Sequence, residues 1–183
     1  MPEIDTSNGE STPGVRVLGI DPGLNCTGYG VIEHGVRGPI LREGGIIRST
    51  AKLPLSERVC EIATGLRDVI AELRPSVMAI EQIFSHTRNP KTAILMAHAR
   101  GVILLCASER KLPVVHYSAT QIKKLLTGNG RAGKEQIQHA VTHELRLKQI
   151  LEPNDVADAV AVALCHYHSI RYTVADLTQS MGP

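Results

Sequence analysis

The chain has 183 residues, of which 43% are hydrophobic and 21% charged, which is the size and composition of a single globular domain with its own core. Its four cysteines form no C-x-x-C pair, which argues against a zinc site and against a disulfide framework. The absence of an apolar run of spanning length, and of a secretory leader, predicts a cytoplasmic protein without a membrane partner. The net charge is only +2, so the overall charge by itself excludes no class of partner.

Two tails are predicted to flank one domain. Residues 1–14 are polar and rich in turn formers, which is typical of a disordered tail. We place the single domain at 15–172 and a flexible carboxy-terminal tail at 173–183. No internal repeat or low-complexity linker interrupts the domain.

Three β patterns open the domain. The connections between them are short and contain Gly and Asn, so they allow only antiparallel neighbours and predict a meander. The strands are expected at residues 15–21, 27–33 and 44–50.

A helical period follows the third strand. Apolar residues recur at helical spacing between Pro54 and Pro75 and predict one helix there. An apolar strand is then expected at 77–84, a long helix at 90–110 and a strand at 113–117. Further helices are expected at 119–127, 133–146 and 154–170.

The order of these elements, βββαβαβα continuing in helices, defines the fold class. Two helical crossovers add parallel strands to the antiparallel meander. The prediction is an α/β protein with a mixed five-stranded sheet, three strands antiparallel and two parallel, and helices on both faces. This is the plan of ribonuclease-H-like folds.

Two carboxylates lie at the ends of predicted strands. Asp21 closes the first strand directly before a Pro-Gly turn, and Glu81 interrupts the otherwise apolar strand V-M-A-I-E-Q-I-F. The topology makes these strands adjacent and parallel, so both carboxylates can lie at one end of the sheet. A charge in a buried strand is costly unless it is compensated. Taken singly, each acid could instead be a rim residue that accepts a hydrogen bond from a nearby loop.

Two more carboxylates open the last helix. Asp155 and Asp158 are three residues apart and share one helix face. Helix capping by Asn154 or Asp155 and the helix dipole explain one aspartate well. They explain Asp158 less well, because its neighbours are small and apolar. If all four acids converge, their hard oxygen ligands suit Mg²⁺ or Mn²⁺, and two such ions about 3.5–4 Å apart can promote in-line phosphoryl displacement.

A basic segment separates these acids in the sequence. Residues 85–134 hold nine Lys/Arg against one acidic residue, Glu109, whereas the rest of the chain holds eleven against seventeen. A local net charge of +8 in a background of −6 indicates a face that binds a polyanion. The alternative is a solvated lysine-rich surface. The residues that we assign to DNA binding on this basis are Arg88, Lys91, Lys123, Lys124, Arg131 and Lys134.

The chain resembles the family of RuvC-type Holliday junction resolvases over about residues 15–170. The motifs that carry the resemblance, in the right order, are G-I-D-P-G-L-N-C-T-G-Y-G-V-I, A-I-E-Q-I-F, A-R-G-V-I, Q-I-K-K followed by A-G-K-E-Q-I-Q, and D-V-A-D-A-V-A-V-A-L-C-H-Y-H. The resemblance implies a dimeric, Mg²⁺-dependent endonuclease of the bacterial cytosol with a ribonuclease-H-like fold. Such an enzyme nicks opposed strands of a four-way DNA junction symmetrically and leaves 5′-phosphate and 3′-hydroxyl ends.

The resemblance also assigns roles to residues. It implies that Asp21, Glu81, Asp155 and Asp158 are the catalytic acids and bind two Mg²⁺ ions per subunit, with Mn²⁺ as a possible substitute. It implies that Phe84 stacks on DNA bases and that Lys123 and Lys134 contact DNA, and it adds a RuvAB-type branch-migration complex as a partner. From the residues alone, a lone phenylalanine such as Phe84 is more often a core side chain than a stacking platform. The predicted helix at 90–110 is apolar nearly all round, so it is either a central core helix or also a homodimer contact.

Three other interpretations compete with this one. Another ribonuclease-H-like nuclease would use the same acids. Actin-like ATPases and sugar kinases also place D-x-G after an apolar strand, but they need two such domains and a second phosphate-binding turn. A non-catalytic DNA-binding module would keep four acids that repel the DNA backbone.

Two local motifs resemble functional sites but are interpreted differently. Residues 128–135 fit G-x-x-x-x-G-K, but Glu135 replaces the Ser/Thr and a helical segment precedes the loop, so we reject a P-loop. His166 and His168 could be metal ligands, but an exposed or capping role at a helix end is the expectation.

Overall fold

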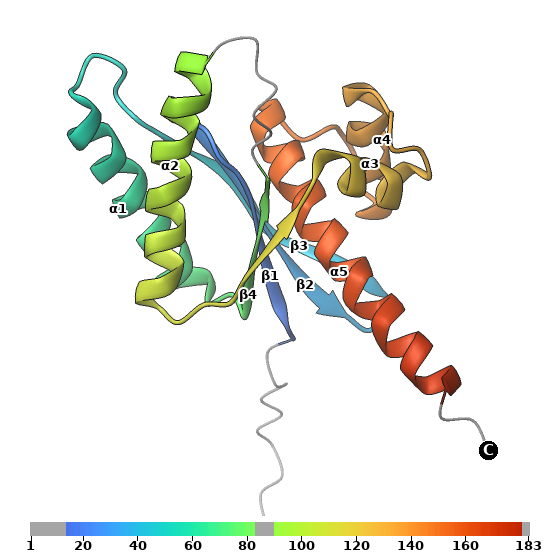
Figure 1. Ribbon diagram of the computed structural model, residues 1–183. Coiled ribbons are helices and arrows are strands. Elements are labelled where there is room, and N and C mark those ends of the chain that lie inside the picture. Colours follow the sequence, from blue (N-terminus) through green and yellow to red (C-terminus); the bar gives the residue numbers. More distant parts are fainter. Residues whose placement is uncertain (1–13, 83–89, 181–183) are drawn as a thin grey trace, which may run out of the picture.

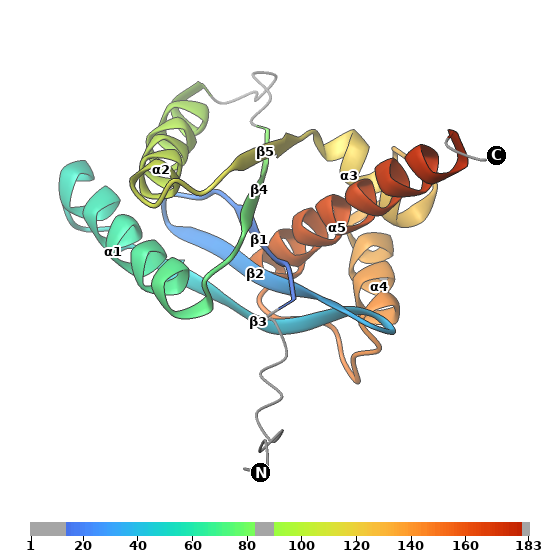
Figure 2. The same ribbon diagram turned by 90° about the horizontal axis from the view of Figure 1, so that it is seen from below.

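A computed structural model describes residues 14–82 and 90–180, with side chains up to residue 170. One five-stranded sheet forms the centre, with two helices on one face and three on the other (Figures 1 and 2). The elements in chain order are β1 (Arg16–Asp21), β2 (Cys26–Gly35), β3 (Gly38–Arg48), α1 (Leu55–Leu73), β4 (Val77–Glu81), α2 (Pro90–Glu109), β5 (Val114–Tyr117), α3 (Ala119–Thr127), α4 (Lys134–Glu144) and α5 (Asn154–Ser180).

The sheet confirms the predicted topology. Its strand order is β3-β2-β1-β4-β5, with β1, β2 and β3 antiparallel and β4 and β5 added in parallel. The two crossovers run through α1 and α2, as the change from period two to helical spacing predicts. The mixed sheet with helices on both faces is therefore the predicted fold.

Some boundaries differ from the prediction. β2 and β3 form a longer hairpin than expected, because the polar stretch between the apolar runs also pairs across the two strands. The last helix runs on to Ser180 instead of ending near residue 170, so the predicted boundary of the carboxy-terminal tail at 173 falls inside α5. Both errors have one cause. Polar residues take part in strand pairing and extend the helix, and the hydrophobic pattern does not mark them.

The alternation of side chains along β1 and β4 divides the core into two clusters. Leu18, Ile20, Met78 and Ile80 pack on the side of α1 and α2. The residues between them in sequence, such as Ala79, pack on the side of α5. Figure 2 shows the sheet between these two layers.

Glycines allow α5 to lie unusually close to β1 and β2. A Cβ added to Gly28 would lie 2.0 Å from the carbonyl oxygen of Asp155, and one added to Gly19 would lie 2.1 Å from that of Ala159. No other residue fits at such positions without moving the helix. The amino-terminal half of α5 is therefore fixed by contact with the sheet backbone.

The helix α2 is the single element in the described ranges that is long and apolar enough to cross a membrane by length and composition. One such helix is weak evidence for a membrane span, because core helices of soluble proteins pass the same test. Here α2 packs beside α1 over the sheet (Figure 1).

Candidate active site

The sheet brings Asp21 and Glu81 to the same edge. β1 and β4 are parallel and hydrogen-bonded, with Ile20 opposite Ile80, and each acid is the next residue and the last of its strand. The alternation of side chains directs both acids toward the α5 side, because Ile20 and Ile80 pack on the opposite side. Two strand ends thus place two carboxylates beside each other.

The first turns of α5 lie above this edge. Gly28, the partner of Asp21 across β1 and β2, is the residue whose added Cβ would strike the backbone of Asp155. Asp158 lies one turn further along and is only partly exposed among the buried residues of the helix. The close packing of α5 therefore sets both aspartates over the strand that ends in Asp21.

Electrostatics show that the four acids interact. Burial raises the pKa of Asp21 to about 7, and repulsion from Asp158, Glu81 and Asp155 adds to the shift, while Lys134 opposes it. The pKa of Glu81 is also raised, first by burial and then by Asp158, while Lys123 opposes the shift. Two neighbouring carboxylates that are both ionised repel each other and destabilise the folded state. Such repulsion is common where carboxylates bind a cation or take part in catalysis.

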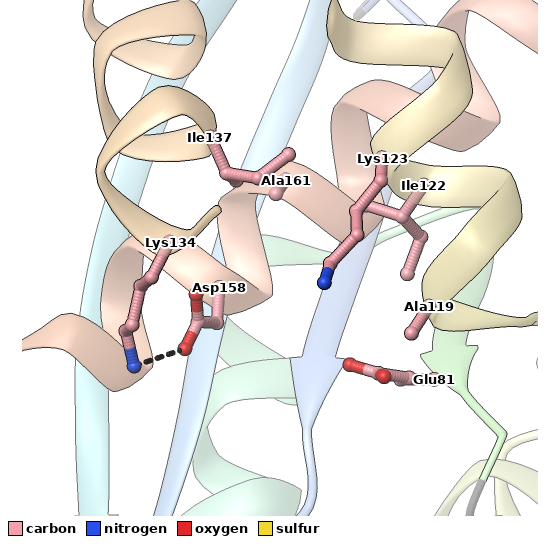
Figure 3. A pocket seen from close by; sticks show the side chains of 8 residues that line it. All are labelled: Glu81, Ala119, Ile122, Lys123, Lys134, Ile137, Asp158 and Ala161. Atoms are coloured by element: carbon pink, nitrogen blue, oxygen red, sulfur yellow. Dashed lines mark ion pairs between the residues drawn. The ribbon is translucent and has the colours of Figure 1, made fainter. Parts of the chain in front are cut away.

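A pocket of about 260 Å³ opens beside these acids (Figure 3). Side chains from β4, α3, α4 and α5 surround it, and two lysines reach toward two of the acids. The residues that line it are Glu81, Ala119, Ile122, Lys123, Lys134, Ile137, Asp158 and Ala161.

Both lysines of the pocket are held by short helices. Lys134 is the first residue of α4, and its Nζ lies 2.9 Å from Oδ2 of Asp158, which raises the pKa of the lysine. Lys123 lies on α3, whose start is fixed directly after β5 by a capping box of Ser118 and Gln121. The pocket therefore combines carboxylates with two ammonium groups that can neutralise phosphate oxygens.

The donor set fits a hard divalent cation. Carboxylate oxygens are the ligands that Mg²⁺ and Mn²⁺ prefer, and a cation would relieve the repulsion that raises the pKa of Asp21. As the side chains stand, no three His, Cys, Asp or Glu groups of the described residues lie close enough together to hold one ion. Asp158 already contacts Lys134, so this carboxylate is partly neutralised by the chain itself.

The other predicted DNA-binding residues are placed less centrally. Phe84 and Arg88 lie outside the described residues. Lys91, Lys124 and Arg131 are exposed on α2, on α3 and in the α3–α4 connection, and none of them lines the pocket. Of the basic residues predicted from the sequence, the structure thus brings Lys123 and Lys134 to the acids.

The structure explains the loop that resembles a P-loop and the two histidines of the last helix. The G-x-x-x-x-G-K match follows no strand, because residues 128–133 connect α3 to α4 and Lys134 begins α4, so it is not a phosphate-binding P-loop. The expectation of an exposed or capping position is wrong for His166, which is buried within α5 and lies 2.8 Å from the hydroxyl of Tyr117. The reason is that α5 continues well beyond residue 170. His168 lies 3.3 Å from the Glu144 carboxylate.

Sequence reasoning missed two groups of residues that shape the site. One is the set of glycines beneath α5, whose signal was the spacing of Gly28 and Gly30 on one face of β2. The other is Arg100, whose guanidinium binds the backbone carbonyl of Glu81. The four cysteines are free, as the sequence predicts.

A mixed sheet of this order, with carboxylates at the ends of its first and fourth strands and on its last helix, defines a ribonuclease-H-like nuclease. The family model described as "Crossover junction endodeoxyribonuclease RuvC" matches residues 17–166. The chain belongs to the RuvC family. The resemblance drawn from its motifs is thereby confirmed, and so is its class as an endonuclease.

Individual relatives agree with the family match. The crossover junction endodeoxyribonuclease RuvC of Rhodopirellula baltica is 54% identical over 152 residues, which cover 82% of this chain and 85% of the relative. That of Pelotomaculum thermopropionicum is 41% identical over 152 residues, which cover 83% and 92%.

Solved structures agree as well. Thermus thermophilus RuvC superposes with a TM-score of 0.79 at 33% identity, covering 87% of this chain and 97% of that one. T. thermophilus RuvC in complex with Holliday junction substrate superposes with a TM-score of 0.82 at 34% identity, covering 87% and 96%. The yeast mitochondrial resolvase Ydc2, at 15% identity and a TM-score of 0.61, shares the fold.

Proposed function

We propose that this protein is a crossover junction endodeoxyribonuclease that resolves four-way DNA junctions in recombination and repair by symmetric paired nicks. The observation that carries the proposal is the electrostatic interaction of Asp21 with the other three acids, beside a pocket that two of these acids and two lysines line. The chain is also 54% identical to a relative of that name. A relative at 34% identity has been solved with its Holliday junction substrate, which supports the same choice of DNA.

Asp21, Glu81 and one of the two aspartates of α5 would hold the divalent cations that nucleases of this family need. Asp21 interacts electrostatically with the other three acids, so it is suited to be the shared ligand. Glu81, with Asp155 or Asp158, would complete the ligand set for two Mg²⁺ ions per subunit, and Mn²⁺ could substitute. When bound, such ions supply Lewis-acid activation of water and of the scissile phosphate.

The remaining groups of the pocket would handle the phosphate and the proton. Lys123 and Lys134 would neutralise phosphate oxygens of the cleaved strand, with Lys134 leaving Asp158 to do so. The aspartate of α5 that is not a ligand would accept the proton of the attacking water, and cleavage would leave 5′-phosphate and 3′-hydroxyl ends. Phe84, Arg88, Lys91, Lys124 and Arg131 would extend the DNA contact.

The outer face of α2 is suited to a homodimer contact. Ile94 is 58% and Leu105 53% exposed, and with Ala97, Gly101 and Val102 they border one apolar groove. A Cβ added to Gly101 would meet no atom within 4 Å, so a second α2 can approach closely there. An isologous contact would place two active sites on a substrate that is itself two-fold symmetric.

The enzyme would act in the bacterial cytosol, with a RuvAB-type branch-migration complex as its partner.

The central experiment compares a mobile synthetic four-way junction with linear duplex of the same sequence, in Mg²⁺ and in EDTA. We expect paired nicks in the junction only, and only with metal. Asp21→Asn and Glu81→Gln should each slow cleavage by about 100-fold or more while junction binding persists. Equal cutting of the duplex, or full activity of Asp21→Asn, would refute the proposal.

The dimer contact is tested by Leu105→Asp. We expect sedimentation to show a monomer, because a charge placed in an apolar contact must be desolvated. Ala71→Asp, at an exposed position of α1, is the matched control and should stay dimeric. A dimeric Leu105→Asp variant would move the contact away from α2.

A further inference from the structure

Arg100, on α2, reaches the end of the strand that carries Glu81. Its Nη1 donates a hydrogen bond to the backbone carbonyl oxygen of Glu81, and its Nη2 lies 2.6 Å from Nδ1 of His116 on β5. A guanidinium only donates, so Nδ1 of His116 accepts. One side chain thus ties α2 to the ends of β4 and β5.

This arrangement is costly for an arginine. Arg100 is partly buried, and burial lowers its pKa. None of the ion pairs within the described ranges includes it, whereas Arg16 and Arg42 both bind the Glu33 carboxylate. A cation that is partly removed from water and has only neutral acceptors costs stability, which points to a role at this position.

The register of the sheet explains why the Glu81 carbonyl needs a donor. Gln82 donates its backbone N–H to Tyr117 on β5, so the peptide groups of Glu81, the preceding residue, face β1. With Ile20 opposite Ile80, the ladder donor for the Glu81 carbonyl would be the N–H of residue 22. Residue 22 is proline and has no N–H.

We infer that Arg100 is a positioning residue for Glu81, because its guanidinium supplies the hydrogen bond that Pro22 cannot. The contact fixes the last peptide of β4 and, through it, the direction of the Glu81 carboxylate toward Asp21 and Asp158. Arg100 acts through the backbone, since the charges that face the Glu81 carboxylate are those of Asp158 and Lys123. The inference rests on the proposed function of Glu81 as a metal ligand.

The test uses Arg100→Ala in the full-length protein, with Arg110→Ala, an exposed position just after α2, as the control for loss of charge. Mn²⁺ binding is titrated without DNA, and single-turnover cleavage is measured at saturating junction. We expect Arg100→Ala to weaken Mn²⁺ binding and slow cleavage by about 10-fold or more each, with junction affinity in EDTA unchanged. Arg100→Lys keeps a cationic donor group but not the fork that reaches two acceptors, so it should lose less, and Arg110→Ala should match the wild type.

A second variant tests the backbone argument directly. Pro22→Ala gives residue 22 an N–H, so adding it to Arg100→Ala should recover part of the Mn²⁺ affinity. Amide exchange at Gln82 should be faster in Arg100→Ala and slower again in the double variant. Unchanged Mn²⁺ affinity and Gln82 exchange in Arg100→Ala, an equal loss in Arg110→Ala, or no recovery in the double variant would overturn the inference.

These readouts separate the two proposals. A wild-type protein that leaves junctions uncut would refute the proposed function. The Mn²⁺ and amide-exchange results decide the role of Arg100 in either case, because neither depends on cleavage.

Discussion

The two faces of the sheet are packed in different ways. On the side of α1 and α2, fully buried large side chains such as Leu18, Leu66 and Ile103 fill the space between helices and strands. On the side of α5, Gly19 and Gly28 let the helix backbone rest on the strands. The catalytic acids that we propose all lie on this second side.

The difference shows which part of the fold fixes the position of the acids most precisely. Large side chains can adopt other rotamers, so a substitution on the α1–α2 side changes stability before it moves a strand. A contact between backbone atoms has no such freedom. The position of Asp155 and Asp158 above Asp21 is therefore held by direct contact of the α5 backbone with the glycines of the sheet.

The largest effect is expected for Gly28→Ala. Its Cβ would lie 2.0 Å from the carbonyl oxygen of Asp155, so α5 must shift at the point where it carries the site. We expect a loss of about 3 kcal/mol in the free energy of unfolding and a fall of about 100-fold in single-turnover cleavage. Urea denaturation and junction cleavage measure the two quantities.

The matched control is Leu66→Ala on α1, a fully buried leucine of the opposite cluster. It should cost a similar amount, about 2–5 kcal/mol, yet leave the cleavage rate per folded molecule unchanged. Similar losses of activity in both variants would show that the two faces do not differ in the way described.

A smaller change, an increase in the free energy of unfolding, is expected for Asp21→Asn. The pKa of Asp21 is raised from 3.8 to about 7, so the folded state binds its proton more tightly than the unfolded state does. Ionised Asp21 therefore destabilises the metal-free protein increasingly as the pH rises from about 4 to 7. We expect Asp21→Asn to raise the free energy of unfolding by about 1–3 kcal/mol at pH 8 in EDTA and by nothing below pH 4.

Two comparisons check this result. Asp68→Asn, at an exposed acid of α1, should not change the stability at either pH. Saturating Mg²⁺ should stabilise the wild type more than Asp21→Asn, because ligand binding to the folded state adds to stability. An Asp21→Asn variant that is less stable than the wild type at pH 8 would contradict the repulsion argued for the site.

The sequence predicts the fold well because hydrophobic period and loop length are local signals. Asp21 and Glu81 could be placed at one sheet edge by topology alone. The close approach of α5 to the sheet could not be predicted from the sequence. The role of Gly28 and Gly30 becomes visible only when the helix that covers them is known. Arg100 was missed for the same reason, since its role depends on a register that sets Pro22 beside Glu81.

The smallest effect concerns Glu33, a buried acid on β2 that lies opposite Arg16, at the other end of β1 from Asp21. Arg42 and Arg16 both donate to its carboxylate, and they lower its pKa from 4.5 to about 2. Unlike Asp21, it is compensated by the chain itself, so removing its charge should cost stability. We expect Glu33→Gln to lose about 1 kcal/mol above pH 5, a modest value because Arg42 is partly exposed.

The pH dependence of Glu33→Gln gives the sharper test. A lowered folded pKa contributes stability that is complete above pH 4.5 and is lost as the pH falls toward 2, so the difference from the wild type should shrink over that range. Cleavage at neutral pH should stay normal, because Glu33 lies on β2 opposite the first residue of β1, whereas Asp21 is the last residue of β1. The two acids of one sheet would then respond to neutralisation with opposite signs, and a loss of stability in both variants would show that Asp21 is compensated by the chain as Glu33 is.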